Sequence, residues 1–277
     1  MTVTFPVIAL IWTGLFGLAI GSFLNVVIHR VPAGIPLTTA SRCPRCEAPI
    51  RWWQNVPVLS WMALRGRCAA CSAPIAARYP VVEAATAVMF VGVAWFLFSV
   101  RPDAFGPGAP AAMIAVAAAF LWFAGISIAL AVIDLDTNRL PDAIVLPSYL
   151  VGGVLFTLAC LLGAEWSRLL QAAIGMAALY LFYFLLRVAR PGGMGGGDVK
   201  LAGVIGMHLG WLGWDVLIVG AFGAFVLGGV YGVALLVLRQ AGRRTAIPFG
   251  PWMILGAWVA VVAGHPLAQW YLGLLPA

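Results

Sequence analysis

The 277-residue sequence has very little charge, because only 9% of its residues are Asp, Glu, Lys or Arg. Soluble domains carry about 25% charged residues. With 63% hydrophobic residues and a mean hydropathy of +1.02, the chain has too little polar surface to cover a water-exposed globule. Its apolar runs are long enough to cross a bilayer as helices, which takes about 20 residues. Composition therefore excludes an ordinary soluble protein and indicates a membrane protein.

The apolar runs also lack the alternation of polar and apolar residues that a transmembrane β-barrel requires. The stretch 111–133 shows no such alternation. The first run, about 7–28, lacks the basic start and the small-residue cleavage site of a secretory signal peptide. It is therefore expected to be a retained transmembrane helix.

Eight apolar runs predict an all-α polytopic membrane protein with about eight transmembrane helices. The sixth run is short and contains glycine, so it could be a half-helix or part of a re-entrant segment. A total of six or seven spans is therefore the alternative to eight. The runs lie at about 7–28, 81–100, 111–133, 142–163, 169–189, 199–213, 215–238 and 251–273.

Basic residues favour the cytoplasmic side of a membrane protein. With the start of the first helix outside, alternating loops place fourteen basic residues inside and only Arg101 and Arg168 outside. The net charge of +7 is then explained by topology and by contact with anionic membrane lipids rather than by nucleic acid. The fourteen inner residues are Arg30, Arg42, Arg45, Arg51, Arg65, Arg67, Arg78, Arg139, Arg187, Arg190, Lys200, Arg239, Arg243 and Arg244.

Only one polar stretch, about 29–80, is long enough to be a domain, and no internal repeat stands out. The expected organisation is a first transmembrane helix at 1–28, a cytoplasmic metal-binding segment at 29–80 and a transmembrane catalytic domain at 81–277. Trp52, Trp53 and Trp61 of the polar segment could form a small core or an interfacial anchor, and the anchor is favoured because aromatic belts are common at this depth.

Four of the five cysteines form two C-x-x-C pairs within this polar segment, at Cys43 and Cys46 and at Cys68 and Cys71. A two-residue gap folds into a turn that points both sulfurs at one ion, and two such turns complete a tetrahedral S₄ shell. This pattern predicts a structural zinc-ribbon-like site with no position left for water or substrate. Disulfide pairing is the alternative, but the predicted topology places these thiols in a reducing compartment. Cys160 lies in an apolar run and is expected to serve packing.

Five of the nine carboxylates lie at the predicted cytoplasmic ends of helices, where ionisable groups are costly and tend to be functional. Asp103, Glu165 and Asp215 fall near outer loops, and Glu47 lies in the metal-binding segment. The five are Glu83, Asp134, Asp136, Asp142 and Asp198.

Two of the contexts around these carboxylates differ from ordinary helix ends. Asp134, Asp136 and Asp142 flank a turn between two helices, with Asp142 placed to stabilise the start of the second. On a helix Asp134 and Asp136 point in different directions, so only one can easily face a partner. Asp198 follows a run with five glycines in the six positions 192–197. This run could be a flexible loop with a capping aspartate, or it could let a substrate backbone approach Asp198 closely.

Two carboxylates on facing helix ends suit general acid–base hydrolysis. An ionised carboxylate takes a proton from the attacking water, while a protonated one hydrogen-bonds the carbonyl oxygen, so the pair shares a proton and titrates as a unit. The histidines are scattered, and no Ser/His/Asp arrangement competes. Residue chemistry alone leaves Asp136 and Asp142 open as alternatives to Asp134.

The ordered set of motifs resembles the bacterial type IV prepilin peptidases, which are leader peptidases and N-methyltransferases. The resemblance covers nearly the whole chain, and its ordered combination is far more specific than a G-x-G-D motif alone. It rests on 21–30 (GSFLNVVIHR), the two C-x-x-C pairs, 55–57 (NVP), 78–83 (RYPVVE), 134–142 (DLDTNRLPD), 195–198 (GGGD) and 248–251 (PFGP).

The resemblance implies that Asp134 and Asp198 are the catalytic aspartates and that Cys43, Cys46, Cys68 and Cys71 bind zinc. It also implies an enzyme of the bacterial cytoplasmic (inner) membrane that removes the basic leader of prepilins and pseudopilins on the cytoplasmic side. Bifunctional members then methylate the new N-terminus with S-adenosylmethionine. The rival interpretations are an ion- or proton-coupled transporter and a metal-ribbon membrane scaffold, both of which leave the glycines beside Asp198 unexplained.

Overall fold

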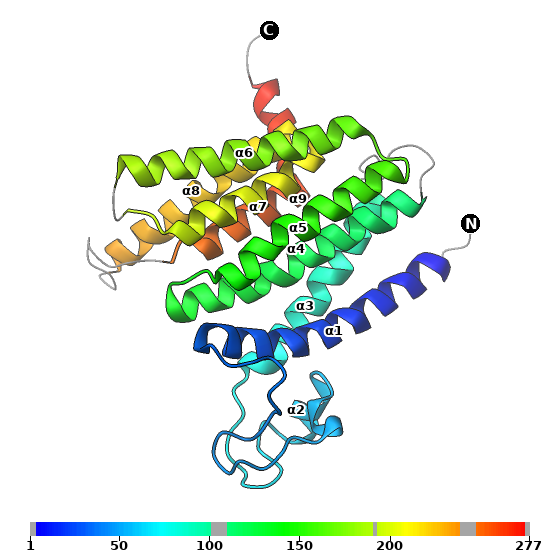
Figure 1. Cartoon of the computed structure of the whole chain (residues 1–277), viewed down its shortest axis with the longest axis vertical. Helices are drawn as coiled ribbons and strands as arrows, with labels where there is room; N and C mark the ends of the chain where they lie inside the picture. Colours follow the sequence, from blue (N-terminus) through cyan, green and yellow to red (C-terminus); the bar gives the residue numbers. More distant parts are fainter. Residues whose placement is uncertain (1–3, 101–109, 191–192, 239–247, 275–277) are drawn as a thin grey trace. The chain divides into compact units, whose positions relative to one another are not determined.

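The computed structural model of the chain describes residues 4–100, 110–190, 193–238 and 248–274. Its regular secondary structure in these ranges is helical, and the segment 34–77 between the first two long helices is mostly irregular (Figure 1). Their only β-type pairings are two isolated bridges, Arg42 with Pro49 and Arg67 with Pro74. Several residues used in the predictions lie outside the described ranges: Arg101, Asp103, Gly192, Arg239, Arg243 and Arg244.

The described residues contain seven helices that are long and apolar enough to cross a membrane, so the chain is a multi-pass membrane protein. These helices are α1 (Thr4–Ala33), α3 (Arg78–Trp95, continued by the short η2, Phe96–Val100), α4 (Pro110–Thr137), α5 (Asp142–Leu161), α6 (Trp166–Ala189), α8 (Trp214–Val237) and α9 (Gly250–Gly273).

The sixth predicted run forms α7 (Gly196–Leu212), which has only 17 residues. At 1.5 Å per residue it is about 26 Å long, shorter than the roughly 30 Å hydrocarbon core. Every residue from Leu201 to Leu212 is buried, because α7 packs against α5, α6, α8 and α9. The short run is therefore an interior helix enclosed by longer ones, as Figure 1 shows for the yellow ribbon.

The chain divides into two compact units. The first unit comprises residues 1–100 together with 124–129 of α4, and the second comprises residues 101–123 and 130–277. The first unit is built on the packing of α1 against α3, and the polar segment between these helices forms an insertion with two short helices, η1 (Trp52–Asn55) and α2 (Leu59–Ala63).

Glycines allow close helix packing in both units. A Cβ at Gly17 of α1 would lie 2.7 Å from the Cα of Ala87 in α3, and one at Gly21 would lie 2.6 Å from the Cα of Glu83. In the second unit, a Cβ at Gly206 of α7 would overlap the carbonyl oxygen of Gly175 in α6. Small residues of this kind let helix backbones approach inside a membrane, where no hydrophobic effect drives helices together.

Candidate active site and metal centre

Asp134 lies in the last turns of α4 and is only 4% exposed. Its Oδ2 accepts a hydrogen bond from the backbone N–H of Gly250, the first residue of α9, at 3.1 Å. Asp136, two residues further along the same helix, is exposed. A rotation of about 200° over two helical residues explains why one carboxylate points into the unit and the other does not.

Asp198 lies in the first turn of α7 and is half-buried. Its Oδ2 accepts the backbone N–H of Gly195, the residue that caps this helix, at 3.0 Å. The carboxylate of Asp198 is within electrostatic range of Asp134 and of the Tyr183 hydroxyl. Both predicted aspartates thus lie in the second unit, close enough for their charges to interact, and each has one oxygen held by a backbone N–H at the start of a helix.

Leu140 touches the beginnings of both helices that carry these N–H groups. A Cβ at Gly250 would lie 2.7 Å from Oδ2 of Asp134 and 3.3 Å from Cδ2 of Leu140. A Cβ at Gly197 would lie 2.8 Å from Cβ of Leu140. The turn after α4 is therefore packed directly against the starts of α7 and α9, and neither glycine position has room for a side chain.

The other glycines beside Asp198 also meet atoms of the protein. A Cβ at Gly195 would lie 3.0 Å from Oδ2 of Asp198, and one at Gly196 would lie 2.6 Å from Nη1 of Arg187 in α6. Both atoms are the ends of side chains that can shift, so internal packing favours small residues here without requiring them. The predicted approach of a substrate backbone to Asp198 remains a prediction.

Asp142 has a different partner. Both of its carboxylate oxygens lie 2.7 Å from Nζ of Lys200 in α7, and the carbonyl of Lys200 accepts the hydroxyl of Tyr149 in α5. Asp142 also occupies the first turn of α5, as predicted, where a negative charge favours the helix N-terminus. It ties α5 to α7 beside the aspartate pair.

The histidines occupy three unrelated settings. His208 is fully buried in α7, where its Nδ1 lies 2.8 Å from the carbonyl oxygen of Val204 and its ring stacks on Phe123. Nδ1 of His265 in α9 lies 2.5 Å from Oδ2 of Asp215. His29 is exposed at the end of α1. The sequence places Asp215 near an outer loop and gives no sign of its histidine partner.

The four predicted metal ligands come together in the insertion. Their sulfur atoms all lie within 4.8 Å of one another, and Sγ of Cys43 is 3.9 Å from Sγ of Cys71. Four sulfurs at the usual zinc–sulfur distance of about 2.3 Å from one tetrahedral ion lie roughly 3.8 Å apart. The cluster is therefore positioned to bind one metal ion, and the donor set of four thiols suits Zn²⁺.

The two halves of the metal centre are built alike. The amide of Cys43 donates to the carbonyl of Ala48 at 3.0 Å, and the amide of Cys68 donates in the same way to Ala73 at 2.8 Å. Glu47 and Ser72, each directly after the second cysteine of its pair, both have φ of 57°. The sequence carries the corresponding signal, because 42–50 (RCPRCEAPI) and 67–75 (RCAACSAPI) share R-C-x-x-C-x-A-P-I. The expectation of no internal repeat is thus wrong at this short length.

Backbone N–H groups of Cys46 and Arg45 lower the pKa of the Cys43 thiol to about 6. Hydrogen bonds to a thiolate favour its ionised form, which is the form that ligates metals. The turn itself thus prepares Cys43 for metal binding.

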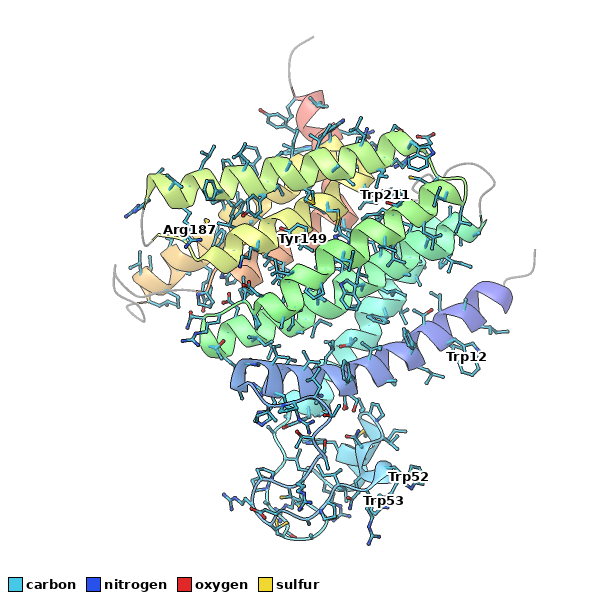
Figure 2. All side chains as sticks on the ribbon, viewed as in Figure 1. Trp12, Trp52, Trp53, Tyr149, Arg187 and Trp211 are labelled. Carbon is cyan, nitrogen blue, oxygen red and sulfur yellow. The ribbon has the colours of Figure 1, made fainter. Side chains whose placement is uncertain are left out.

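The three tryptophans of the insertion do not share one role. Trp61 donates its indole N–H to the carbonyl of Ile75 at 3.1 Å, and its ring lies against Gly66, where φ is +66°. It belongs to the small core of the second cysteine turn, contrary to the anchor expected for it. Trp52 and Trp53 are 83% and 43% exposed, and the anchor interpretation stays open for them (Figure 2).

Two charged residues of the first unit, Arg30 and Glu83, are buried. Arg30 is 8% exposed at the end of α1 and donates to the carbonyls of Leu37 at 2.8 Å and Thr39 at 2.6 Å. Glu83 of α3, one of the five carboxylates at predicted helix ends, accepts the backbone N–H of Val58 at 2.7 Å. Both residues fasten the insertion to the helices that flank it.

Comparison with known proteins assigns both parts of the chain. Residues 15–97 match the bacterial peptidase A24 N-terminal domain, and residues 121–233 match the type IV leader peptidase family. No solved structure matches the chain with statistical support.

Several curated relatives match almost end to end, each named prepilin leader peptidase/N-methyltransferase. The relative from Aeromonas hydrophila is 36% identical over 93% of this chain and 92% of its own length. The relative from Stutzerimonas stutzeri is 36% identical over 92% of this chain and 91% of its own length. The relative from Pseudomonas aeruginosa is 32% identical over 96% of this chain and 94% of its own length. With the aspartate pair, the cysteine centre and the helical membrane fold in place, this chain belongs to the type IV leader peptidase family.

Proposed function

We propose that the protein is a membrane aspartic endopeptidase that removes the basic leader of type IV prepilins and pseudopilins, with Asp134 and Asp198 as its catalytic pair. One observation carries the residue assignment. The two carboxylates come from the ends of different helices, lie within electrostatic range of each other, and each have one oxygen held by a helix-initial N–H. Membership of the leader peptidase family supports the reaction and the substrate class.

The mechanism follows from two carboxylates sharing one proton. Close like charges cannot easily both ionise, so one group is ionised and takes a proton from the attacking water. The protonated partner hydrogen-bonds the carbonyl oxygen of the scissile peptide and later gives its proton to the leaving amine. The N–H groups of Gly250 and Gly195 hold each carboxylate in a fixed direction throughout.

The depth of the pair suits this substrate. Asp134 lies near the end of a membrane-spanning helix, and Asp198 begins the interior helix α7. A prepilin has a hydrophobic helix in the membrane and a basic leader beyond it, so its scissile bond lies at the membrane edge. In the proposed topology this edge faces the cytoplasm of a bacterial inner membrane, as the bias of basic residues indicates.

The insertion has a proposed structural role. Zinc bound by Cys43, Cys46, Cys68 and Cys71 would fill all four positions of a tetrahedral shell, so it supplies folding stability rather than Lewis acidity toward a substrate. The names of the relatives also support a second activity, in which S-adenosylmethionine methylates the new N-terminus. The proposed boundaries are 1–28 for the first helix, 29–80 for the metal-binding segment and 81–277 for the peptidase domain.

The proposed peptidase is tested by charge-neutral replacement. Asp134→Asn and Asp198→Asn should each lower cleavage of a co-purified prepilin by about 10²–10⁴-fold, the usual contribution of general acid–base catalysis. Asp136→Asn, on the same helix but exposed, should keep most of the activity.

Folding of each variant is checked by its metal content and thermal midpoint. A folded Asp198→Asn protein that cleaves at the wild-type rate would show that the assigned pair is wrong. Methyl transfer is measured separately, by following a labelled methyl group from the donor to the mature pilin.

A further inference from the structure

The insertion presents an apolar edge that its own core does not use. Trp52 of η1 is 83% exposed, and Leu59 and Met62 of α2 are 66% and 63% exposed. Because η1 packs against α2, these side chains lie on adjoining elements. The small core around Trp61 and the metal centre use other residues, so most of the surface of Trp52, Leu59 and Met62 stays exposed.

The same segment is strongly basic. Residues 29–80 contain seven arginines, no lysine and a single acidic residue, Glu47. Arg51 directly precedes η1 and Arg65 follows α2, and both side chains are exposed. This charge would repel a basic leader peptide, whereas anionic lipid headgroups attract clustered arginines beside a membrane.

The edge belongs to a segment that is held at both ends by membrane-spanning helices. The insertion leaves the end of α1 and returns to the start of α3, both of which are membrane-spanning helices of the same unit. In Figure 2, Trp52 and Trp53 lie on the margin of the insertion that is turned toward the N-terminal end of α1, where Trp12 is labelled. Because both ends of the insertion are tied to α1 and α3, its exposed edge lies within reach of the membrane surface.

We propose that the edge formed by Trp52, Trp53, Leu59 and Met62, flanked by Arg51 and Arg65, docks on the anionic lipid surface beside α1. The aromatic and aliphatic side chains enter the headgroup region, and the arginines pair with lipid phosphates. Docking fixes the metal-binding insertion against the membrane at a third point, besides its two covalent connections. This surface is independent of the aspartate pair and of the proposed cleavage reaction.

The test uses the full-length, metal-loaded protein in lipid nanodiscs. Amide hydrogen exchange of the segment 50–62 is compared between discs of phosphatidylcholine alone and discs that also contain phosphatidylglycerol. Exchange should be several-fold slower in the anionic discs. The double variant Trp52→Ser/Trp53→Ser should lose this protection, and Arg51→Gln/Arg65→Gln should lose its dependence on anionic lipid.

Leu37→Ser provides the matched control, because Leu37 is an exposed apolar residue of the insertion outside η1 and α2, and this variant should behave like the wild type. Metal content verifies that each variant keeps a folded insertion. Equal exchange in the two lipids, or a Trp52→Ser/Trp53→Ser variant as protected as the wild type, would overturn the proposal. Prepilin cleavage, measured in the same samples, reports separately on Asp134 and Asp198.

Discussion

The cysteine centre of the insertion and the aspartate pair of the second unit gather their side chains in different ways. Each cysteine turn spans a few residues and is closed by its own backbone hydrogen bonds, such as Cys43 N–H to Ala48 O. Asp134 and Asp198 lie on different helices, and they come near each other because Leu140, in the turn after α4, packs against the starts of α7 and α9. The first site therefore depends on local turns and a metal ion, and the second on helix packing.

This contrast has a consequence for mutation. A local turn tolerates changes elsewhere in the chain but fails when a ligand is lost, because the ion supplies much of the stability of a small domain. A site between helix ends keeps its fold when one side chain changes, but it loses geometry when a helix start moves by a fraction of an ångström. Four experiments separate these behaviours.

The largest expected effect comes from removing metal ligands. Cys43→Ser/Cys68→Ser should abolish metal binding and unfold the insertion, since structural zinc contributes about 10–16 kcal/mol to small zinc domains. Elemental analysis measures the metal, and hydrogen exchange should accelerate across 41–76 while α7 remains protected. Cys160→Ser, at a buried cysteine of α5 outside the cluster, should keep about one ion per chain. Retention of the metal by the double variant would refute the S₄ assignment.

A smaller effect is expected from Gly250→Ala at the start of α9. The new Cβ would lie 2.7 Å from Oδ2 of Asp134, so the carboxylate must move. Misplacing a catalytic group by about 1 Å can cost roughly 10²-fold in rate, and prepilin cleavage should fall by that order. The control is Gly153→Ala on α5, where a Cβ meets nothing within 4 Å. Equal cleavage rates in the two variants would mean that the N–H of Gly250 does not position Asp134 for catalysis.

Gly206→Ala tests the packing of α7 without touching either carboxylate. Its Cβ would overlap the carbonyl oxygen of Gly175, and overpacking of this kind costs about 1–3 kcal/mol. The thermal midpoint should fall, although alanine in place of glycine favours a helix by up to about 1 kcal/mol. The control is Gly229→Ala on α8, where a Cβ meets nothing within 4 Å, and this variant should show only the gain in helix stability. A midpoint as high as that of the control would indicate that α6 and α7 adjust freely.

The smallest effect is expected for Lys200→Met. The ion pair with Asp142 is well formed at 2.7 Å, but the two side chains are 34% and 55% exposed. Exposed ion pairs contribute about 0–1 kcal/mol, so the loss of stability should not exceed roughly 1 kcal/mol. A double-mutant cycle with Asp142→Asn, followed by thermal unfolding in detergent, isolates the pair. A coupling well above that range would mean that α5 and α7 depend on this contact more than its exposure indicates.

The sequence alone determined the membrane class and the composition of the metal centre. Long apolar runs have few structural solutions in a bilayer, and a C-x-x-C pair defines its own turn, so neither inference needs distant contacts. The short repeat R-C-x-x-C-x-A-P-I can also be found in the sequence alone, because each turn is formed by residues only a few positions apart.

Only the tertiary structure decided which carboxylate of the turn is buried at the start of α9 and how the glycines are used. Asp134 and Asp136 have similar local chemistry, and the direction in which α4 presents its last turns comes from packing against distant helices. Gly197 and Gly250 are far apart in sequence, yet both accommodate Leu140. The burial of α7 likewise depends on four neighbouring helices, contacts that no local pattern encodes.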